Sequence, residues 1–138
     1  MDKSEILAFI NKNTACFLAT TEGDTPHVRG MGVCRAYENG IILYTAKHKA
    51  VYQQIVKNPK VEICFYDFQN AVQMRVSGRM EIVEDMTLKK EIGTTRPRAI
   101  AKVAKEGYDW LAVLRLKNGK ASTWSRKATI NPKTLVDL

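Results

Sequence analysis

Turn-forming residues divide this chain into short apolar runs, and this punctuation restricts the possible folds more than any other feature of the sequence. Glu22-Gly23-Asp24 and Glu38-Asn39-Gly40 are tight-turn sequences, and Lys117-Asn118-Gly119-Lys120 repeats the Asn-Gly hairpin signal. The runs between them are rich in Val, Ile, Phe and Tyr, which is typical of β-strands. Strands are expected at residues 14–21, which are apolar enough for a buried strand, and at 27–36, 41–45, 61–66, 72–83, 111–116 and 121–125.

Amphipathic patterns predict short helices between these strands. Ser4 is the expected N-cap of a helix that Lys12-Asn13 ends, and Asn58-Pro59 ends a second helix over residues 49–57. Two further helical segments are expected at residues 86–92 and 99–105. Six or seven mostly antiparallel strands with three or four short helices suit a closed or half-closed barrel with helices packed outside. Because so small a barrel is filled by its own side chains, a cofactor is expected on its outside.

The length of the chain predicts one domain, residues 1–138, with one core. Such a body has little room for a deep cavity, so a second subunit is expected to supply one wall of any site for a large flat cofactor. The three cysteines have no metal-ligand spacing, so no metal site is expected. The sequence shows no secretory signal and no apolar run of membrane-spanning length, which predicts a cytoplasmic protein without a membrane partner. The net charge of +8 favours nucleic acid, an acidic membrane surface or a phosphorylated small molecule as partner. Nucleic acid ranks last, because no nucleic-acid-binding motif is present.

The expected strand at residues 27–36 carries two glycines, which mark a bulge or the close approach of another backbone or a ligand. Strand alternation places Arg29 and Met31 on one face. Gly30 exposes backbone N–H and C=O groups, which could meet the polar edge of a flat heterocycle. A bulged strand with a solvent-facing arginine explains the same residues equally well.

The segment from Tyr44 to Lys49 joins a strand end to a helix start, where unpaired N–H groups and the helix dipole favour an anion. Lys47 and Lys49, with the hydroxyl of Thr45 close by, supply charge-assisted donors for a phosphate dianion. Taken alone, the segment is explained more simply as a helix N-terminus with ordinary exposed lysines.

Gln73 places an amide in an otherwise apolar strand, so this amide either faces solvent or contacts a polar group. Trp124 offers a large flat surface, although tryptophans in such positions usually anchor a core or an interface. His27 and His48 are the only histidines and have no identifiable partner, so no catalytic residue can be assigned. Any reactive atoms are therefore expected to belong to a cofactor.

Taken in order, three stretches resemble the pyridoxamine 5'-phosphate oxidase-like, FMN-binding split-barrel family, especially its general-stress-protein branch. They are PHVRGMGV, ILYTAKHKAVYQQIVKNPKVEICFYD and VQMRVSGRMEIVED, and the similarity is best over residues 4–85. The resemblance implies a mainly β fold, a six-stranded antiparallel split barrel with short helices, and a homodimer with two FMN sites in its interface. It also implies the cofactor-binding residues. They are Arg29, Lys49, Thr45 and Lys47 at the phosphate, Gly30 and Met31 beside the flavin, Gln73 in contact with it, Trp124 from the partner subunit, and Tyr44 without a more specific role.

The resemblance does not extend to vitamin B6 oxidation. True pyridoxamine-phosphate oxidases carry an Arg-Leu-His-containing segment near the C-terminus, whereas this chain has no histidine after His48. The expected function is an FMN-dependent oxidoreductase with an unknown small-molecule substrate. A stress protein that binds flavin or haem without turnover is the alternative, and the deazaflavin cofactor is a further possibility.

Overall fold

A computed structural model describes residues 1–128 and 134–138 of the chain. The strands are β1 (Ala15–Glu22), β2 (Thr25–Tyr37), β3 (Gly40–Ala46), β4 (Lys60–Asp67), β5 (Val72–Val83), β6 (Leu111–Ser125) and β7 (Leu135–Asp137). The helices are α1 (Lys3–Lys12), α2 (Ala50–Lys57), α3 (Met86–Thr95) and α4 (Pro97–Glu106), and a 3-10 turn follows at Arg126–Ala128. None of the helices within these residues is long and apolar enough to cross a membrane.

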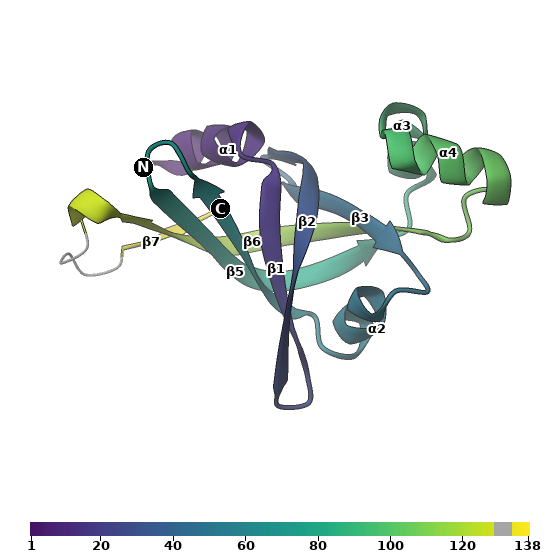
Figure 1. The fold of residues 1–138 in the computed structure, drawn as a ribbon, viewed down its shortest axis with the longest axis horizontal. Helices are drawn as coiled ribbons and strands as arrows, with labels where there is room; N and C mark the ends of the chain where they lie inside the picture. Colours follow the sequence, from purple (N-terminus) through teal and green to yellow (C-terminus); the bar gives the residue numbers. More distant parts are fainter. Residues whose placement is uncertain (129–133) are drawn as a thin grey trace.

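The strands form one antiparallel sheet in the order β3-β2-β1-β4-β5-β6-β7, and pairing of β3 with β6 closes the first six into a barrel (Figure 1). This confirms the predicted mainly β fold. Burial alternates along β1, where Leu18 is fully buried while Phe17 is 50% exposed. The expectation of a wholly buried strand at residues 14–21 was therefore wrong, because a barrel strand has an inner and an outer face.

Two apolar clusters hold the elements together. The larger one fills the barrel, where Ile63 and Phe65 are fully buried, and α1 covers it with Ile6. The smaller one lies outside the barrel and packs α3 and α4 against β3 and β6. It contains Ile42, Leu88, Ile92, Ala99, Leu111 and Val113. This second cluster fixes the position of α4 at one side of the barrel (Figure 1).

The β6 strand runs without a turn through Asn118 and Gly119, so the hairpin predicted there was wrong. Asn118 has a left-handed backbone conformation (φ 54°), and the β5–β6 register shifts at this point, which makes the Asn-Gly pair a β-bulge opposite Gly78. A Cβ atom on Gly119 would lie 2.7 Å from Cγ1 of Val76, so the bulge requires a glycine. Because β6 stays continuous, it pairs with β3 and β5 and closes the barrel.

Helix α1 begins at Lys3, and its N-cap is Asp2 rather than the predicted Ser4. The Asp2 carboxylate accepts a hydrogen bond from the backbone N–H of Glu5 (2.9 Å), and the Glu5 carboxylate accepts one from the backbone N–H of Asp2 (2.8 Å). This reciprocal capping box satisfies two free donors, which a serine at position 4 could not do.

The β1–β2 hairpin extends away from the barrel (Figure 1). Residues 25–32 of β2 pair with β1, whereas β3 pairs only with residues 33–37 of β2. In the described part of the chain, one edge of β2 thus has no partner strand over residues 25–32. Pro26 is tolerated there, so β2 begins at Thr25 and not near His27 as predicted.

Candidate functional site

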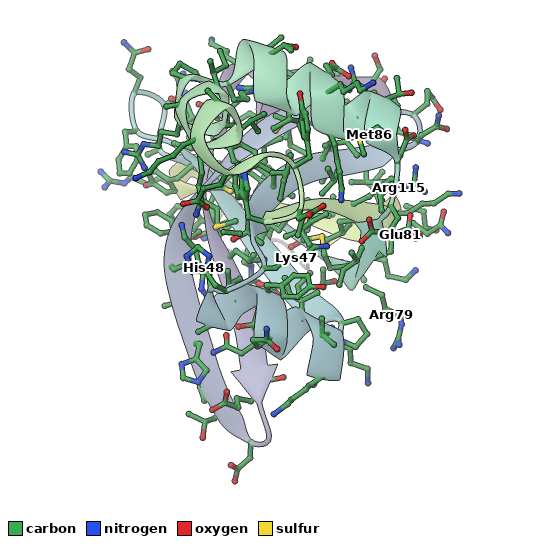
Figure 2. All side chains as sticks on the ribbon, turned by 90° about the vertical axis from the view of Figure 1, so that its right-hand side faces the viewer. Lys47, His48, Arg79, Glu81, Met86 and Arg115 are labelled. Carbon is green, nitrogen blue, oxygen red and sulfur yellow. The ribbon has the colours of Figure 1, made fainter. Side chains whose placement is uncertain are left out.

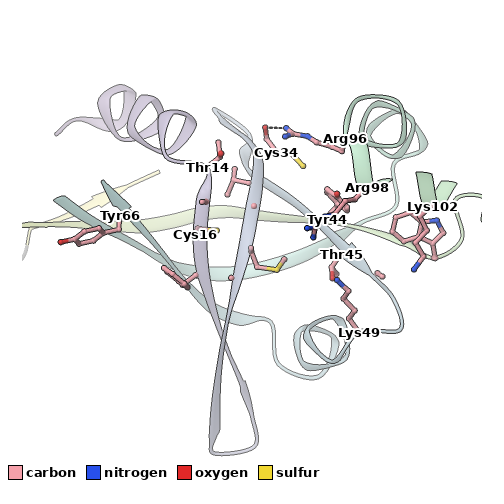
Figure 3. A pocket seen from close by; sticks show the side chains of 18 of the residues that line it. Thr14, Cys16, Cys34, Tyr44, Thr45, Lys49, Tyr66, Arg96, Arg98 and Lys102 are labelled. Carbon is pink, nitrogen blue, oxygen red and sulfur yellow. Dashed lines mark hydrogen bonds between the residues drawn. The ribbon is translucent and has the colours of Figure 1, made fainter. Parts of the chain in front are cut away.

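A cleft of about 640 Å³ opens on the outside of the barrel, within the size range of small-molecule sites. Its lining comes from the first half of β1, from β2, from the end of β3, from the start of α2 and from α4 with the segment after it (Figure 3). Tyr66 and Phe68, which pack edge to face with ring centroids 4.7 Å apart, form its aromatic side. The cleft therefore lies where the sequence analysis expected a cofactor, outside a filled barrel.

Gly30 and Gly32 form part of the lining of the cleft, and Met31 lies between them. Both glycines are exposed, and a Cβ atom added to either would meet no atom within 4 Å. The β2 backbone is thus bare on this face, beside the strand edge that lacks a partner. A flat ring could lie directly against this backbone, and any larger side chain at these positions would occupy the space.

Four basic residues line the cleft, and among the described residues no acidic one does. They are Lys49, Arg96, Arg98 and Lys102. Arg96 donates a hydrogen bond from Nη2 to the carbonyl oxygen of Cys34 (2.5 Å), which joins the start of α4 to β2. Lys102 Nζ lies 4.8 Å from the centroid of the Trp110 ring. The positive charge suits an anionic ligand.

The α4 side of the cleft was missed from the sequence. Residues 94–98 lie between the two helical segments expected at residues 86–92 and 99–105, and no site role was predicted for them. The structure places Pro97 at the first turn of α4 and turns the flanking arginines to the cleft. The available signal for this side of the cleft was one arginine on each side of a proline that begins a helix. Nothing in the local sequence indicates which element the two arginines face.

The strand end and helix start predicted to hold an anion do meet at the cleft. Lys49 is the N-cap residue of α2, its side chain makes no capping hydrogen bond, and it extends toward Thr45 (Figure 3). Thr45 is buried and Tyr44 is half-buried. Burial raises the pKa of the Tyr44 phenol, and the nearby Arg96 and Arg98 partly offset this increase.

Arg29 is not among the residues that line the cleft, and strand alternation directs its side chain to the face of β2 opposite to Gly30. Its Nη1 donates to the hydroxyl of Thr20 (2.8 Å) and to the carbonyl of Leu18 (3.1 Å), and its Nη2 donates to Oε1 of Gln54 (2.6 Å). Burial lowers the pKa of this guanidinium, and no carboxylate within the described residues pairs with it. A half-buried cation held only by neutral acceptors retains its capacity to bind an anion.

Lys47 also lies outside the cleft lining. Its ammonium lies 3.9 Å from Oε1 of Glu84, and Oε2 of the same carboxylate pairs with Lys89 at 3.0 Å. The next residue, His48, is exposed (Figure 2). The hydrogen bond and the charge of Lys89, together with Lys47, lower the pKa of the Glu84 carboxyl. The Lys47 side chain is therefore directed to an ion pair in this structure.

Gln73 and Trp124 lie side by side, although 51 positions separate them. Gln73 pairs with Trp124 on β6 and with Tyr66 on β4, so the three side chains form a row on the outer face of the barrel. Only Tyr66 of this row lines the cleft. Trp124 is 39% exposed, and two aromatic residues of the cleft lining, Phe17 and Phe68, are 50% and 81% exposed.

The structure thus divides the predicted cofactor-binding residues into two groups. Those at the cleft are Gly30, Met31, Tyr44, Thr45 and Lys49, and those outside its lining are Arg29, Lys47, Gln73 and Trp124.

The cleft thiols give a test of this geometry. Cys16 is 3% exposed, and burial, with a smaller effect of Cys64, raises its pKa to about 12. Burial also raises the pKa of Cys34, which is half-buried.

Because the thiolate is the nucleophile, iodoacetamide should label Cys34 more slowly than free cysteine, and the labelling rate should go on rising at pH values above the ordinary pKa of a thiol. Cys16 should stay unlabelled in the folded protein. Peptide mass spectrometry measures the extent of labelling at each cysteine. Equal labelling of Cys16 and Cys34 without denaturant would contradict the placement of Cys16.

Comparison with known proteins places this geometry in a family. The sequence profile of the family described as pyridoxamine 5'-phosphate oxidase matches residues 2–125. No functionally curated protein matches the chain in sequence. Among solved structures, a NimC/NimA family protein from Clostridium acetobutylicum is similar over 98% of this chain and 92% of its own, with a TM-score of 0.75 and 25% identity.

Two further solved structures share the fold. General stress protein 26 from Bacillus anthracis is similar over the whole of both chains, with a TM-score of 0.75 and 16% identity. A pyridoxamine 5'-phosphate oxidase-related, FMN-binding protein from Nostoc punctiforme is similar over 96% of this chain and 87% of its own, with a TM-score of 0.69 and 17% identity.

Proposed function

Because the chain belongs to the pyridoxamine 5'-phosphate oxidase family, we propose that it binds FMN in the cleft and acts as a flavin-dependent oxidoreductase on a small molecule. The observation that supports this most directly is the cleft itself. Its β2 side carries no side chains at Gly30 and Gly32, and its charged lining residues are all basic within the described part of the chain. A flat cofactor with a dianionic phosphate fits both properties.

The phosphate would be held where α2 begins. Arg29 supplies a guanidinium that pairs with no carboxylate of the described residues, and Lys49 supplies an exposed ammonium at the N-cap of α2. Thr45 adds a hydroxyl group beside Lys49, and Lys47 would assist if it leaves its ion pair with Glu84. These groups bind the anion through charge-assisted hydrogen bonds.

The ring would lie along the backbone of Gly30 and Met31, near Tyr44. When bound, FMN supplies the centre that accepts and donates electrons. The residues of this chain hold and orient it, and the aromatic side of the cleft limits its contact with water. We assign no catalytic residue and no specific substrate.

We further propose that the protein is a homodimer in which Gln73 and Trp124 of one copy reach the cofactor bound to the other. Both residues lie on the outer face of the barrel and not in the cleft of their own chain. Exposed aromatic residues support an interface on this side of the barrel, with Trp124 on its outer face and Phe17 and Phe68 in the cleft lining, because exposed apolar surface is usually covered by a partner.

Titration of the protein with FMN tests the cofactor and the assembly together. We expect saturable binding of one FMN per chain, an absorbance spectrum of oxidised flavin, and sedimentation at twice the chain mass of 15.6 kDa. Reduction of the bound flavin by added electron donors would then separate an oxidoreductase from a flavin carrier. Failure to bind FMN would reject the proposed function, and a monomer that binds FMN would reject only the dimer.

Haem, the alternative cofactor, would have no histidine ligand in the cleft. Haem iron normally takes an axial ligand from the protein, which can be His, Cys, Met or Tyr. Neither histidine is among the described residues that line the cleft, so haem would depend there on Cys34, Tyr44 or Met31.

A further inference from the structure

A polar cluster of three side chains lies beneath β2, at the junction of three elements. Thr20 of β1 donates a hydrogen bond from its hydroxyl to Oε1 of Gln54 on α2 (2.6 Å). The same oxygen accepts from Nη2 of Arg29 (2.6 Å), and the Thr20 hydroxyl accepts from Nη1 of Arg29 (2.8 Å). Thr20 is only 2% exposed and Gln54 only 5%, so both are fixed in the packed interior.

Counting donors shows which part of Arg29 this cluster leaves free. A guanidinium has five N–H groups. Nη1 uses two of them on Thr20 and Leu18, and Nη2 uses one on Gln54. The two that remain without a partner among the described residues are the Nε–H and one Nη2–H. The oxygens of Thr20 and Gln54 are bonded to each other, so they occupy the edge between Nη1 and Nη2. The free Nη2–H therefore lies beside Nε–H, and the two form the lateral edge that binds carboxylate or phosphate in a bidentate manner.

The cluster orients the arginine without neutralising it. Oε1 of Gln54 is an uncharged acceptor that already receives two hydrogen bonds, and the other two acceptors, on Thr20 and Leu18, are also neutral. A glutamate or aspartate in the same place would fix the guanidinium equally well, but it would compensate the charge that attracts an anion. A neutral amide therefore suits a site that reserves the positive charge for a ligand.

We infer that Gln54 and Thr20 are positioning residues, which hold the Arg29 guanidinium so that its lateral edge is free to bind the phosphate dianion of FMN. This inference rests on the proposed function. It explains why a glutamine is buried in α2 and why the amide oxygen is turned to β2. The alternative is that the cluster only attaches α2 to the β1–β2 hairpin.

The ratio of riboflavin to FMN dissociation constants separates these two roles, because the two flavins differ only in the phosphate. We expect Gln54→Leu and Thr20→Val each to weaken FMN binding roughly tenfold and to leave riboflavin binding nearly unchanged. Thr20→Val keeps the side-chain shape, so this variant provides the test if Gln54→Leu does not fold. Equal losses for both flavins, or no loss for either, would overturn the inference.

Asn11→Leu is the matched control. The Asn11 amide also attaches an element to β2, through one bond to the carbonyl (2.7 Å) and one from the N–H (2.8 Å) of Ala36. This variant should lower the melting temperature without changing the ratio. If its ratio changes as much as that of Gln54→Leu, the ratio reports only general loosening and the inference fails.

Inorganic phosphate provides a test that does not need flavin. Phosphate should shift the Nε–H resonance of Arg29 in the parent protein, and a higher concentration should be needed in Gln54→Leu. A parent that binds phosphate but no FMN would reject the proposed function and keep the positioning role. Identical phosphate titrations of the parent and Gln54→Leu would reject the positioning role alone.

Discussion

Replacing Arg29 with methionine is expected to weaken FMN binding by roughly 100-fold or more, and riboflavin binding by less than about threefold. The free lateral edge of Arg29 can donate two hydrogen bonds to a phosphate, and a hydrogen bond to a charged group contributes about 1.5–3 kcal/mol. Methionine keeps an unbranched stem of similar length, so packing beneath β2 changes little. Fluorescence titration with both flavins measures the two dissociation constants.

Arg115→Met is the control for removing a positive charge. Arg115 lies on β6 outside the cleft and donates from Nε to Oε1 of Glu81 at 2.5 Å, so its charge is already paired (Figure 2). Loss of this exposed ion pair should change stability by less than about 1 kcal/mol and leave both flavin affinities unchanged. If Arg29→Met weakens riboflavin as much as FMN, then Arg29 supports the fold and does not bind the phosphate.

The strands were predictable because their signals are local. Alternation of apolar and polar side chains and the Asn39-Gly40 turn identify neighbouring strands without knowledge of the rest of the molecule. Gly40 has a φ of 129°, which a glycine accepts readily. Asn118-Gly119 carries the same signal, but an Asn-Gly pair also suits a bulge. The choice of a bulge depends on the continuous β5 strand beside it, which is distant in the sequence.

The site was predictable only in part, for a similar reason. Gly30 and Lys49 were found because a bare strand and a basic helix start are local chemistry. Arg96 was missed because it reaches β2 across 62 positions, through packing of α3 and α4 on the outside of the barrel. The bond between Arg29 and Gln54 spans 25 positions and three elements. No local pattern in either segment indicates this pairing.

Replacing Gly30 with valine should weaken FMN and riboflavin alike, by about 30- to 150-fold, which corresponds to roughly 2–3 kcal/mol of overpacking. A Cβ at position 30 meets no protein atom within 4 Å, so the valine side chain would occupy the space proposed for the ring. Valine also favours strands more than glycine does, so the melting temperature should stay constant or rise. Dissociation constants and thermal unfolding of the same preparations measure both effects.

Gly30→Ala provides a graded comparison, because a single methyl group should produce a smaller loss for both flavins than valine does. Arg29 and Gly30 are adjacent in β2 and face opposite sides of the strand, so their variants probe the two ends of one ligand. If the Arg29 variant loses affinity only for FMN, the phosphate lies on the Arg29 side of the strand. If the Gly30 variants lose affinity for both flavins, the ring lies on the Gly30 side. A Gly30→Val protein that is stable and binds both flavins normally would place the ring elsewhere, even if Arg29 still binds the phosphate.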